Sequence, residues 1–222
     1  MAEFSFCTRQ LARTSHHESA APTQLRLRYK TAWSILHEIR QARSDRNHRY
    51  PLSGLIEIDD ASFGGVRAGK RGRGAGTKTP VRVMVESHGK KRAGFVGIRT
   101  LPRVDRESVH EVVAEEIQPG QAIRTDGLPL GDQLTTFHQT HDGSPAPPHQ
   151  AGAVLPWVRT VISNAKRFLL GTYQGVSHRH LQRCLDELCY RFNRRRWEPQ
   201  LSMRQLRACV AASPVTYAEP RG

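Results

Sequence analysis

The chain has 222 residues, of which 37% are hydrophobic and 24% are charged, so it is long enough to bury one core without disulfide bonds. Its 34 basic and 20 acidic residues give a formal net charge of +14, which argues against an ordinary neutral metabolic enzyme. Such a charge favours a polyanionic partner. Arginine supplies 28 of the basic residues, and its paired contacts with phosphate oxygens favour nucleic acid. Arginine-rich codon usage would give the same composition.

No segment approaches the roughly 18 consecutive apolar residues that a membrane-spanning helix needs. The first residues also lack the apolar core of a secretory signal. The cysteines at Cys7, Cys184, Cys189 and Cys209 form no Cys-x-x-Cys pair, so no zinc ribbon is indicated. We expect reduced thiols in packing positions and a cytoplasmic protein.

The first part of the chain predicts one helix. Residues 1–22 show no sustained periodicity and are expected to be disordered. From Tyr29 to Ala42 apolar residues recur at helical spacing among basic ones, which predicts an amphipathic basic helix. This helix either packs on the main domain with its basic face in solvent or enters a DNA groove. Residues 44–51 are polar and basic and are interpreted as a linker.

The middle of the chain predicts a mixed α/β sheet. Strands are expected at residues 52–60, 80–87, 93–100 and 121–125, with a helix at 105–117 before the last of them. Three successive strands followed by a helix and a strand are typical of a mixed sheet. Residues 142–152 are rich in proline and glycine and predict a loop.

The clearest helix is expected at residues 177–192, and a weak helix at 203–212 follows it. Its apolar stripe is formed by Leu181, Cys184, Leu185, Leu188 and Phe192. Arg179, Arg183, Asp186 and Glu187 are expected to face away from that stripe. The run FNRRRW at 192–197 either touches DNA or caps the helix.

Acidic residues at the ends of predicted strands are candidates for metal binding. Asp59 and Asp60 end the first strand, and Asp126 follows a later one. Where strand ends converge, such carboxylates can bind Mg²⁺ or Mn²⁺. Two such ions stabilise an in-line displacement at phosphorus. The alternative is an ordinary turn role, which is common for aspartate.

A basic, glycine-rich loop is expected at residues 64–80. Its glycines allow the backbone to approach a ligand, but it lacks the Gly-Lys-Ser/Thr order of a nucleotide-hydrolysing phosphate loop. We expect it to contact a nucleic-acid backbone, with a merely solvated loop as the alternative. Its basic residues are Arg67, Lys70, Arg71, Arg73 and Lys78.

Five segments occur in a family-specific order: IEIDDASFGG (56–65), KRGRGAGTKTPV (70–81), IRTDG (123–127), LPWVRTVISNAKRFLLGTYQGVS (155–177) and HLQRCLDELCYRFNRR (180–195). Over about residues 29–196 the chain thereby resembles the insertion-sequence transposases of the ISXO-like type, which belong to the DDE superfamily. The resemblance implies a ribonuclease-H-like α/β catalytic domain at 51–197, a mixed sheet flanked by helices. Residues 1–50 are then a lead-in with a remnant helix-turn-helix segment, and 198–222 are a tail.

The resemblance also implies a catalytic set. Asp59 and Asp126, 67 residues apart, match the two catalytic aspartates, and Asn164, 38 residues further on, matches the third position. These three would bind Mg²⁺ or Mn²⁺. Lys166 matches the basic residue that follows and, with Arg167 and the basic loop, would bind DNA phosphates.

The implied function is metal-dependent DNA strand cleavage and strand transfer. The partners would be double-stranded DNA with the terminal inverted repeats of the element, target DNA, and further copies of the chain, in association with a bacterial nucleoid. Family members usually carry a zinc ribbon that is not found here, have Glu where Asp60 stands, and tend to have His where Arg159 stands. The alternative is a catalytically inactive or truncated transposase-derived DNA-binding protein.

Overall fold

The computed structural model describes residues 28–64, 78–89, 91–102, 106–125, 140–142, 155–173 and 176–212. In chain order they form α2 (Tyr29–His48), β1 (Leu55–Phe63), β2 (Thr79–Ser87), β3 (Ala93–Thr100), α3 (Arg106–Glu116), β4 (Ala122–Arg124), β5 (Thr140–Asp142), α6 (Pro156–Tyr173), α7 (His178–Asn193), a 3-10 helix (Arg195–Gln200) and α8 (Leu201–Val210). Within these ranges no helix is long and apolar enough to cross a membrane.

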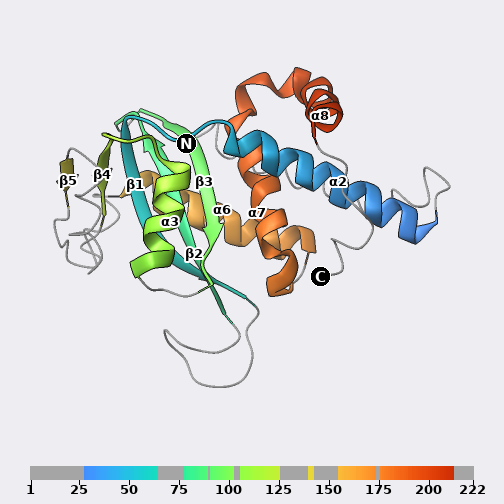
Figure 1. The fold of residues 1–222 in the computed structure, drawn as a ribbon, viewed down its shortest axis with the longest axis horizontal. Coiled ribbons are helices and arrows are strands. Elements are labelled where there is room, and N and C mark those ends of the chain that lie inside the picture. Colours follow the sequence, from blue (N-terminus) through green and yellow to red (C-terminus); the bar gives the residue numbers. More distant parts are fainter. Residues whose placement is uncertain are drawn as a thin grey trace.

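One five-stranded sheet organises the molecule, in the order β3-β2-β1-β4-β5. Strands β1, β2 and β3 are antiparallel neighbours, whereas β4 runs parallel to β1 and β5 parallel to β4. Helix α3 covers one face of the sheet, and α6 and α7 cover the other (Figure 1). This mixed sheet with helices on both faces confirms the predicted ribonuclease-H-like α/β class.

Alternation along the strands builds two separate cores. Successive side chains of a strand point to opposite faces of its sheet. Ile56 and Ile58 of β1 therefore pack with Met84 in the core under α3. Phe63 and the three alternate valines of β2 join the core under α6 and α7. The two faces of β1 thus serve different layers of the protein, and this separates neighbouring acidic residues of that strand.

Strands β2 and β3 and helices α3 and α7 lie within two residues of their predicted bounds. Strand β1 does not end at Asp60 as predicted, because it stays paired with β2 up to Phe63. Asp59 and Asp60 therefore lie inside the strand. Helix α2 continues to His48 through the predicted linker, and residues 140–142 form a strand that the sequence analysis did not predict.

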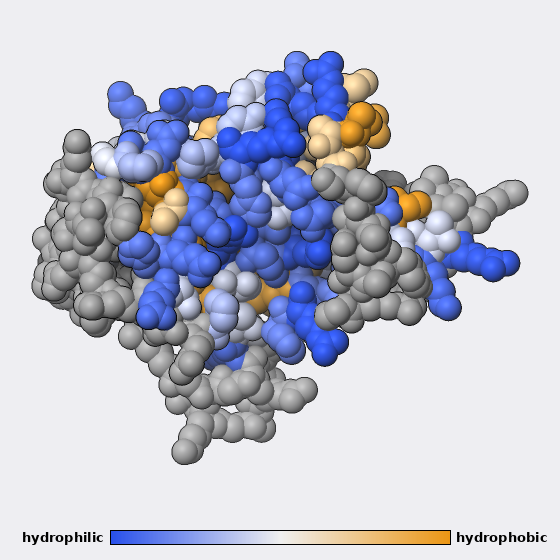
Figure 2. Space-filling model, in the orientation of Figure 1, coloured by the Kyte–Doolittle hydropathy of each residue, from blue (hydrophilic) through white to orange (hydrophobic). Residues whose placement is uncertain are grey.

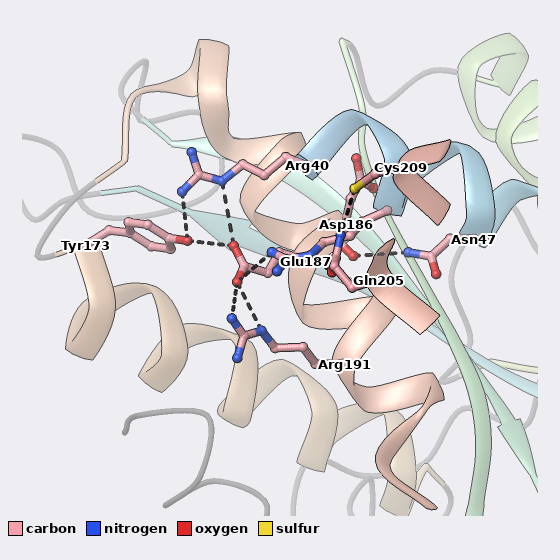
Figure 3. Close-up of polar contacts among 9 residues, drawn as sticks. Arg40, Asn47, Tyr173, Asp186, Glu187, Arg191, Gln205 and Cys209 are labelled. Atoms are coloured by element: carbon pink, nitrogen blue, oxygen red, sulfur yellow. Dashed lines mark hydrogen bonds and ion pairs between the residues drawn. The ribbon is translucent and has the colours of Figure 1, made fainter. Parts of the chain in front are cut away.

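Two of the four polar residues of α7 that were expected to face away from its apolar stripe, Asp186 and Glu187, are buried. The side chain of Glu187 is only 1% exposed and forms ion pairs with Arg43 of α2 at 2.8 Å and with Arg191 at 2.7 Å. Arg40 of α2 lies 3.6 Å away, and the hydroxyl of Tyr173 donates a hydrogen bond of 3.0 Å to the same carboxylate (Figure 3). Helix α2 therefore packs on α7 with part of its basic face turned inward.

The fold shifts the pKa values of these two neighbouring carboxylates in opposite directions. Burial by itself raises the pKa of Glu187, but Arg43, Arg191 and Arg40 outweigh it and lower that pKa to about 2. Burial raises the pKa of Asp186 to about 6, although Gln182 donates a hydrogen bond to its Oδ1 atom. Relative to the ordinary pKa values, the fold therefore stabilises the charged form of Glu187 and the protonated form of Asp186.

Two arginines of the basic run after α7 make contacts that stabilise the fold. Arg195 donates hydrogen bonds to the backbone oxygens of Ala93 at 2.6 Å and Phe192 at 2.8 Å. Arg194 donates to the backbone oxygen of Tyr190 and to Oδ1 of Asn47. Arg194 and Arg195 therefore both help to cap the end of the helix, which is one of the two alternatives for this run.

We expect Glu187→Gln to destabilise the protein by about 3–5 kcal/mol, because three arginines would surround a neutral amide. Urea unfolding followed by circular dichroism measures this loss. The matched control is Glu198→Gln, because Glu198 is exposed and its substitution should change stability by less than about 0.5 kcal/mol. Equal effects of the two substitutions would contradict the structural role of Glu187.

The raised pKa of Asp186 predicts that the stability of the protein depends on pH. Its folded pKa, about 6, lies above the ordinary value of 3.8, so its contribution is present in acid and is lost as the pH rises through about 6. We expect Asp186→Asn to gain stability relative to the unsubstituted protein between about pH 4 and pH 8, by on the order of 3 kcal/mol at most. Urea unfolding across this range tests it, and a difference that stays flat with pH would refute it.

Candidate active site

A buried carboxylate of β1 holds the start of α6. Glu57 is fully buried, and its Oε2 accepts hydrogen bonds from the backbone N–H groups of Trp157 at 2.9 Å and Val158 at 3.1 Å. The first N–H groups of a helix have no partner within the helix, and its N-terminus favours negative charge. Pro156, the first residue of α6, has no N–H to satisfy. Glu57 therefore fixes α6 over this face of β1.

Asp59 lies on the same face of β1 as Glu57, because it follows two residues later. Its side chain is half-buried, and its Oδ1 accepts a hydrogen bond of 2.8 Å from the backbone N–H of Asp60. The candidate catalytic aspartate thus lies on the side of the sheet that α6 covers.

Asp60 points to the opposite face, where it forms an ion pair. It lies directly across from Arg82 of β2 in the strand register. The Nε and Nη2 atoms of Arg82 each donate a 2.9 Å hydrogen bond to a different oxygen of Asp60, and Arg82 is 1% exposed. This bidentate pair gives Asp60 a structural role and separates it from Asp59.

Helix α6 carries the other two candidate residues, Asn164 and Lys166. Its buried stripe is formed by Val158, Val161, Ala165 and Phe168. Asn164 is half-buried beside this stripe, and its Nδ2 is a buried atom with no hydrogen-bond partner among the described residues. Because α6 begins at Pro156, Asn164 lies inside the helix, and Lys166 is about 200° around the axis from it.

Basic side chains gather at the Phe63 end of β1. The Nζ atom of Lys166 is 5.8 Å from the centroid of the Phe63 ring. Lys78 is exposed and directly precedes Thr79, which pairs with Phe63. Arg167 is also exposed. The structure therefore brings Lys78 and Lys166 to one end of β1, although 88 residues separate them in the sequence.

Several predicted site residues lie outside the described residues. These are Asp126, Arg67, Lys70, Arg71 and Arg73. The strand that leads to Asp126 is described, and it pairs with β1 at Leu55↔Ala122, Ile56↔Ile123 and Glu57↔Arg124. In the ranges that the structure describes, no three His, Cys, Asp or Glu side chains converge to hold a metal ion.

Glu57 is a residue that the sequence analysis missed. Its signal is its position two residues before Asp59, which places both side chains on one face of a strand. A carboxylate in the run LIEID is costly to bury unless it finds hydrogen-bond donors. The sequence contains both facts, but the donors belong to a helix 100 residues later.

A comparison with known families gives a match. A family model described as an ISXO2-like transposase domain matches residues 51–193, which is 143 of the 222 residues. The matched region begins just before β1 and ends with α7, so it contains the sheet, Glu57, Asp59 and Asn164. No curated protein sequence and no solved structure gives a match.

We expect the same substitution at the two aspartates of β1 to have different effects on the free energy of unfolding. Asp60→Asn should lower the free energy of unfolding by about 3 kcal/mol, because it leaves the buried guanidinium of Arg82 without its carboxylate. Asp59→Asn is the matched control on the other face and should change stability by less than about 1 kcal/mol. Urea unfolding of both variants measures the difference. Comparable losses of stability in the two variants would contradict a structural role for Asp60 that Asp59 does not share.

Proposed function

The chain belongs to the ISXO2-like transposase family, and we propose that it is an active DDE-type DNA transposase. It cleaves DNA at the ends of an insertion sequence and transfers the freed 3′ ends to target DNA. In this proposal residues 51–197 form the catalytic domain, and the protein works as a homo-oligomer on double-stranded DNA at the bacterial nucleoid.

The register between β1 and β4 carries this proposal. The paired residues differ by a constant 67 positions: Leu55 with Ala122, Ile56 with Ile123, and Glu57 with Arg124. Asp59 and Asp126 are separated by the same 67 positions. Continuing this register by two residues would place the two aspartates side by side, on one face, because paired residues of neighbouring strands share a face.

Helix α6 supplies the third member of the proposed set. Glu57 holds the start of α6 on the face of β1 that carries Asp59, and Asn164 lies about two helical turns beyond that anchor. We assign the metal-binding role to Asp59, Asp126 and Asn164. The assignment rests on this arrangement and on membership of the family.

The donor chemistry fits a hard divalent cation. Carboxylate and amide oxygens are the ligands that Mg²⁺ and Mn²⁺ prefer. Rotating an amide by 180° exchanges its oxygen and its nitrogen, so the unpartnered buried end of Asn164 suits either a cation or a phosphate oxygen. When bound, the ions would stabilise charge on the scissile phosphate and activate the attacking water. With one neutral ligand, the chain holds them weakly in the absence of DNA.

Basic residues near the Phe63 end of β1 would hold the DNA backbone. Lys166 and Arg167 of α6 and Lys78 before β2 are exposed and carry positive charge. The loop residues Arg67, Lys70, Arg71 and Arg73 belong to the segment between β1 and β2, whose two ends meet at the Phe63–Thr79 pair. We propose that all of these bind phosphates, with Lys166 as a point charge beside the site.

Substitution of the proposed ligands tests this function. Asp59→Asn, Asp126→Asn and Asn164→Ala should each reduce cleavage of a duplex bearing a terminal inverted repeat by at least about 100-fold in Mg²⁺ or Mn²⁺. DNA affinity should stay close to that of the unsubstituted protein, because these residues contact the ions rather than the DNA backbone. Gel assays of cleavage and fluorescence anisotropy give the two readouts.

The control for these variants is Glu111→Gln, because Glu111 is exposed on α3, across the sheet from Asp59. It should leave cleavage unchanged. Undiminished cleavage by the Asp59→Asn/Asp126→Asn double variant would refute the site. An unsubstituted protein that binds the duplex and never cleaves it would instead be an inactive, transposase-derived DNA-binding protein.

A further inference from the structure

A cavity of about 270 Å³ lies between α2, α7, α8 and the edge strand β3. It is two strands away from β1 and therefore separate from the candidate active site. Among the described residues, Asp45 is the one acidic residue that lines it, and that carboxylate already accepts a hydrogen bond from Gln41. Five arginines line it: Arg46, Arg49, Arg194, Arg204 and Arg207.

Within the described structure, these arginines lack the carboxylate partners that arginines elsewhere in the fold have. Arg40, Arg43 and Arg191 share Glu187, and Arg82 pairs with Asp60. Across the described ranges, none of the five cavity arginines forms an ion pair with a carboxylate. Burying or clustering positive charge without an anion is costly, so the cavity is suited to an anion from outside the chain.

Arg194 and Arg204 show this need for an anion. Arg194 donates hydrogen bonds only to neutral oxygens within the described residues, those of Asn47 and Tyr190. Burial and the nearby charges of Arg46 and Arg204 lower its pKa. The Nε atom of Arg204 is buried with no hydrogen-bond partner in the same part of the chain. Each of these guanidinium groups would be stabilised by a phosphate.

Aromatic rings hold the guanidinium groups in place. The Cζ atom of Arg194 is 3.8 Å from the centroid of the Tyr190 ring, and that of Arg204 is 4.6 Å from the Trp197 ring. Such stacking fixes the plane of a guanidinium and leaves its N–H edge available to phosphate oxygens. Trp197 is also 39% exposed. Arginines interleaved with aromatic rings are typical of surfaces that bind nucleic-acid strands.

The basic surface continues past this cavity. A second cavity of about 120 Å³ shares Phe95, Asn193 and Trp197 with the first and adds Arg92 and Arg196. The one acidic residue that lines it in the described part of the chain is Glu86, whose two carboxylate oxygens accept hydrogen bonds from backbone N–H groups. The two cavities therefore form one basic groove along the start of β3. An extended groove suits a polymer of phosphates better than a single phosphate ion.

We propose that this groove, which we call the β3-edge groove, binds a segment of DNA backbone that is distinct from the segment at the candidate active site. The inference rests on the proposed function, because it takes DNA as the substrate. Figure 2 shows a hydrophilic surface over the adjoining ends of α2 and α7, next to a hydrophobic patch on α8. In this proposal the arginines of the groove contact the DNA phosphates, and Trp197 lies beside the bound DNA strand.

The test uses Arg49→Gln/Arg207→Gln, because both residues are exposed and neither forms an ion pair within the described structure. The matched control is Arg28→Gln/Arg179→Gln, which removes two exposed arginines outside the groove. Affinity for a fluorescent duplex bearing a terminal inverted repeat is measured by anisotropy in EDTA, over a range of salt concentrations. Circular dichroism confirms that each variant is folded.

We expect the groove variant to bind the duplex at least about tenfold more weakly at 0.1 M salt. Without two of the phosphate contacts, binding displaces fewer counterions from the DNA and is therefore less favourable. The slope of log affinity against log salt should fall by about 2, while the control variant keeps the original slope. Equal losses in both variants would indicate general electrostatics and would overturn the proposal. Competition by inorganic phosphate as effective as competition by duplex, at equal phosphate concentration, would also overturn it.

Failure of this inference and failure of the proposed function give different results. An unsubstituted protein that cleaves the duplex, together with a groove variant of unchanged affinity and slope, overturns the β3-edge groove alone. An unsubstituted protein that binds no duplex overturns both the β3-edge groove and the proposed function. Weaker binding by the groove variant, in a protein whose Asp59→Asn variant still binds fully, supports a second DNA-binding surface.

Discussion

The arrangement of the site depends on the contact between Glu57 and the start of α6. Two hydrogen bonds to a charged carboxylate, each with a net contribution of about 1.5–3 kcal/mol, connect β1 to a helix 100 residues later in the chain. The hydrophobic core between the sheet and α6 also stabilises their packing, but apolar packing alone does not fix an orientation. The carboxylate fixes where α6 begins relative to β1, and so fixes how Asn164 lies relative to Asp59.

The period of the strand then assigns the acidic residues their roles. Glu57 and Asp59 share the face under α6, whereas Asp60 faces α3 and is neutralised by Arg82. A similar division applies to the arginines, because Arg40, Arg43 and Arg191 surround Glu187 inside the protein. The net charge of +14 is therefore not a uniform DNA-binding surface. Part of it stabilises the fold, and the part without acidic partners marks where an external anion fits.

The sequence predicts what is local and misses what is distant. The alternation of β2 and the apolar stripe of α7 locate those elements closely, because strand and helix periods depend on neighbouring residues. The inward orientation of Asp186 and Glu187 could not be read this way, since an apolar stripe does not reveal that α2, more than 130 residues earlier, supplies arginines. The end of β1 was mistaken for the same reason: pairing with β2 keeps polar residues in the strand. The candidate site could be named from its motifs, but Asp126 lies outside the described residues and its place stays a prediction.

The β3-edge groove changes how the flanking helices are understood. Arg46 and Arg49 lie at the end of α2 and just beyond it, and Arg204 and Arg207 lie on α8, all outside the region that matches the family domain. Tyr190, Phe95 and Asn193 of the same cavities lie within it. Contacts such as the hydrogen bond from Asn47 to the backbone of Asp186 hold α2 on α7, so the two groups of residues form one surface. A domain cut at the boundaries of the family match would keep Phe95 and Tyr190 of the groove and lose all five arginines of its larger cavity, together with Trp197. The flanking segments therefore do more than lead into and out of a catalytic core, because they complete the second surface on which we expect DNA to lie.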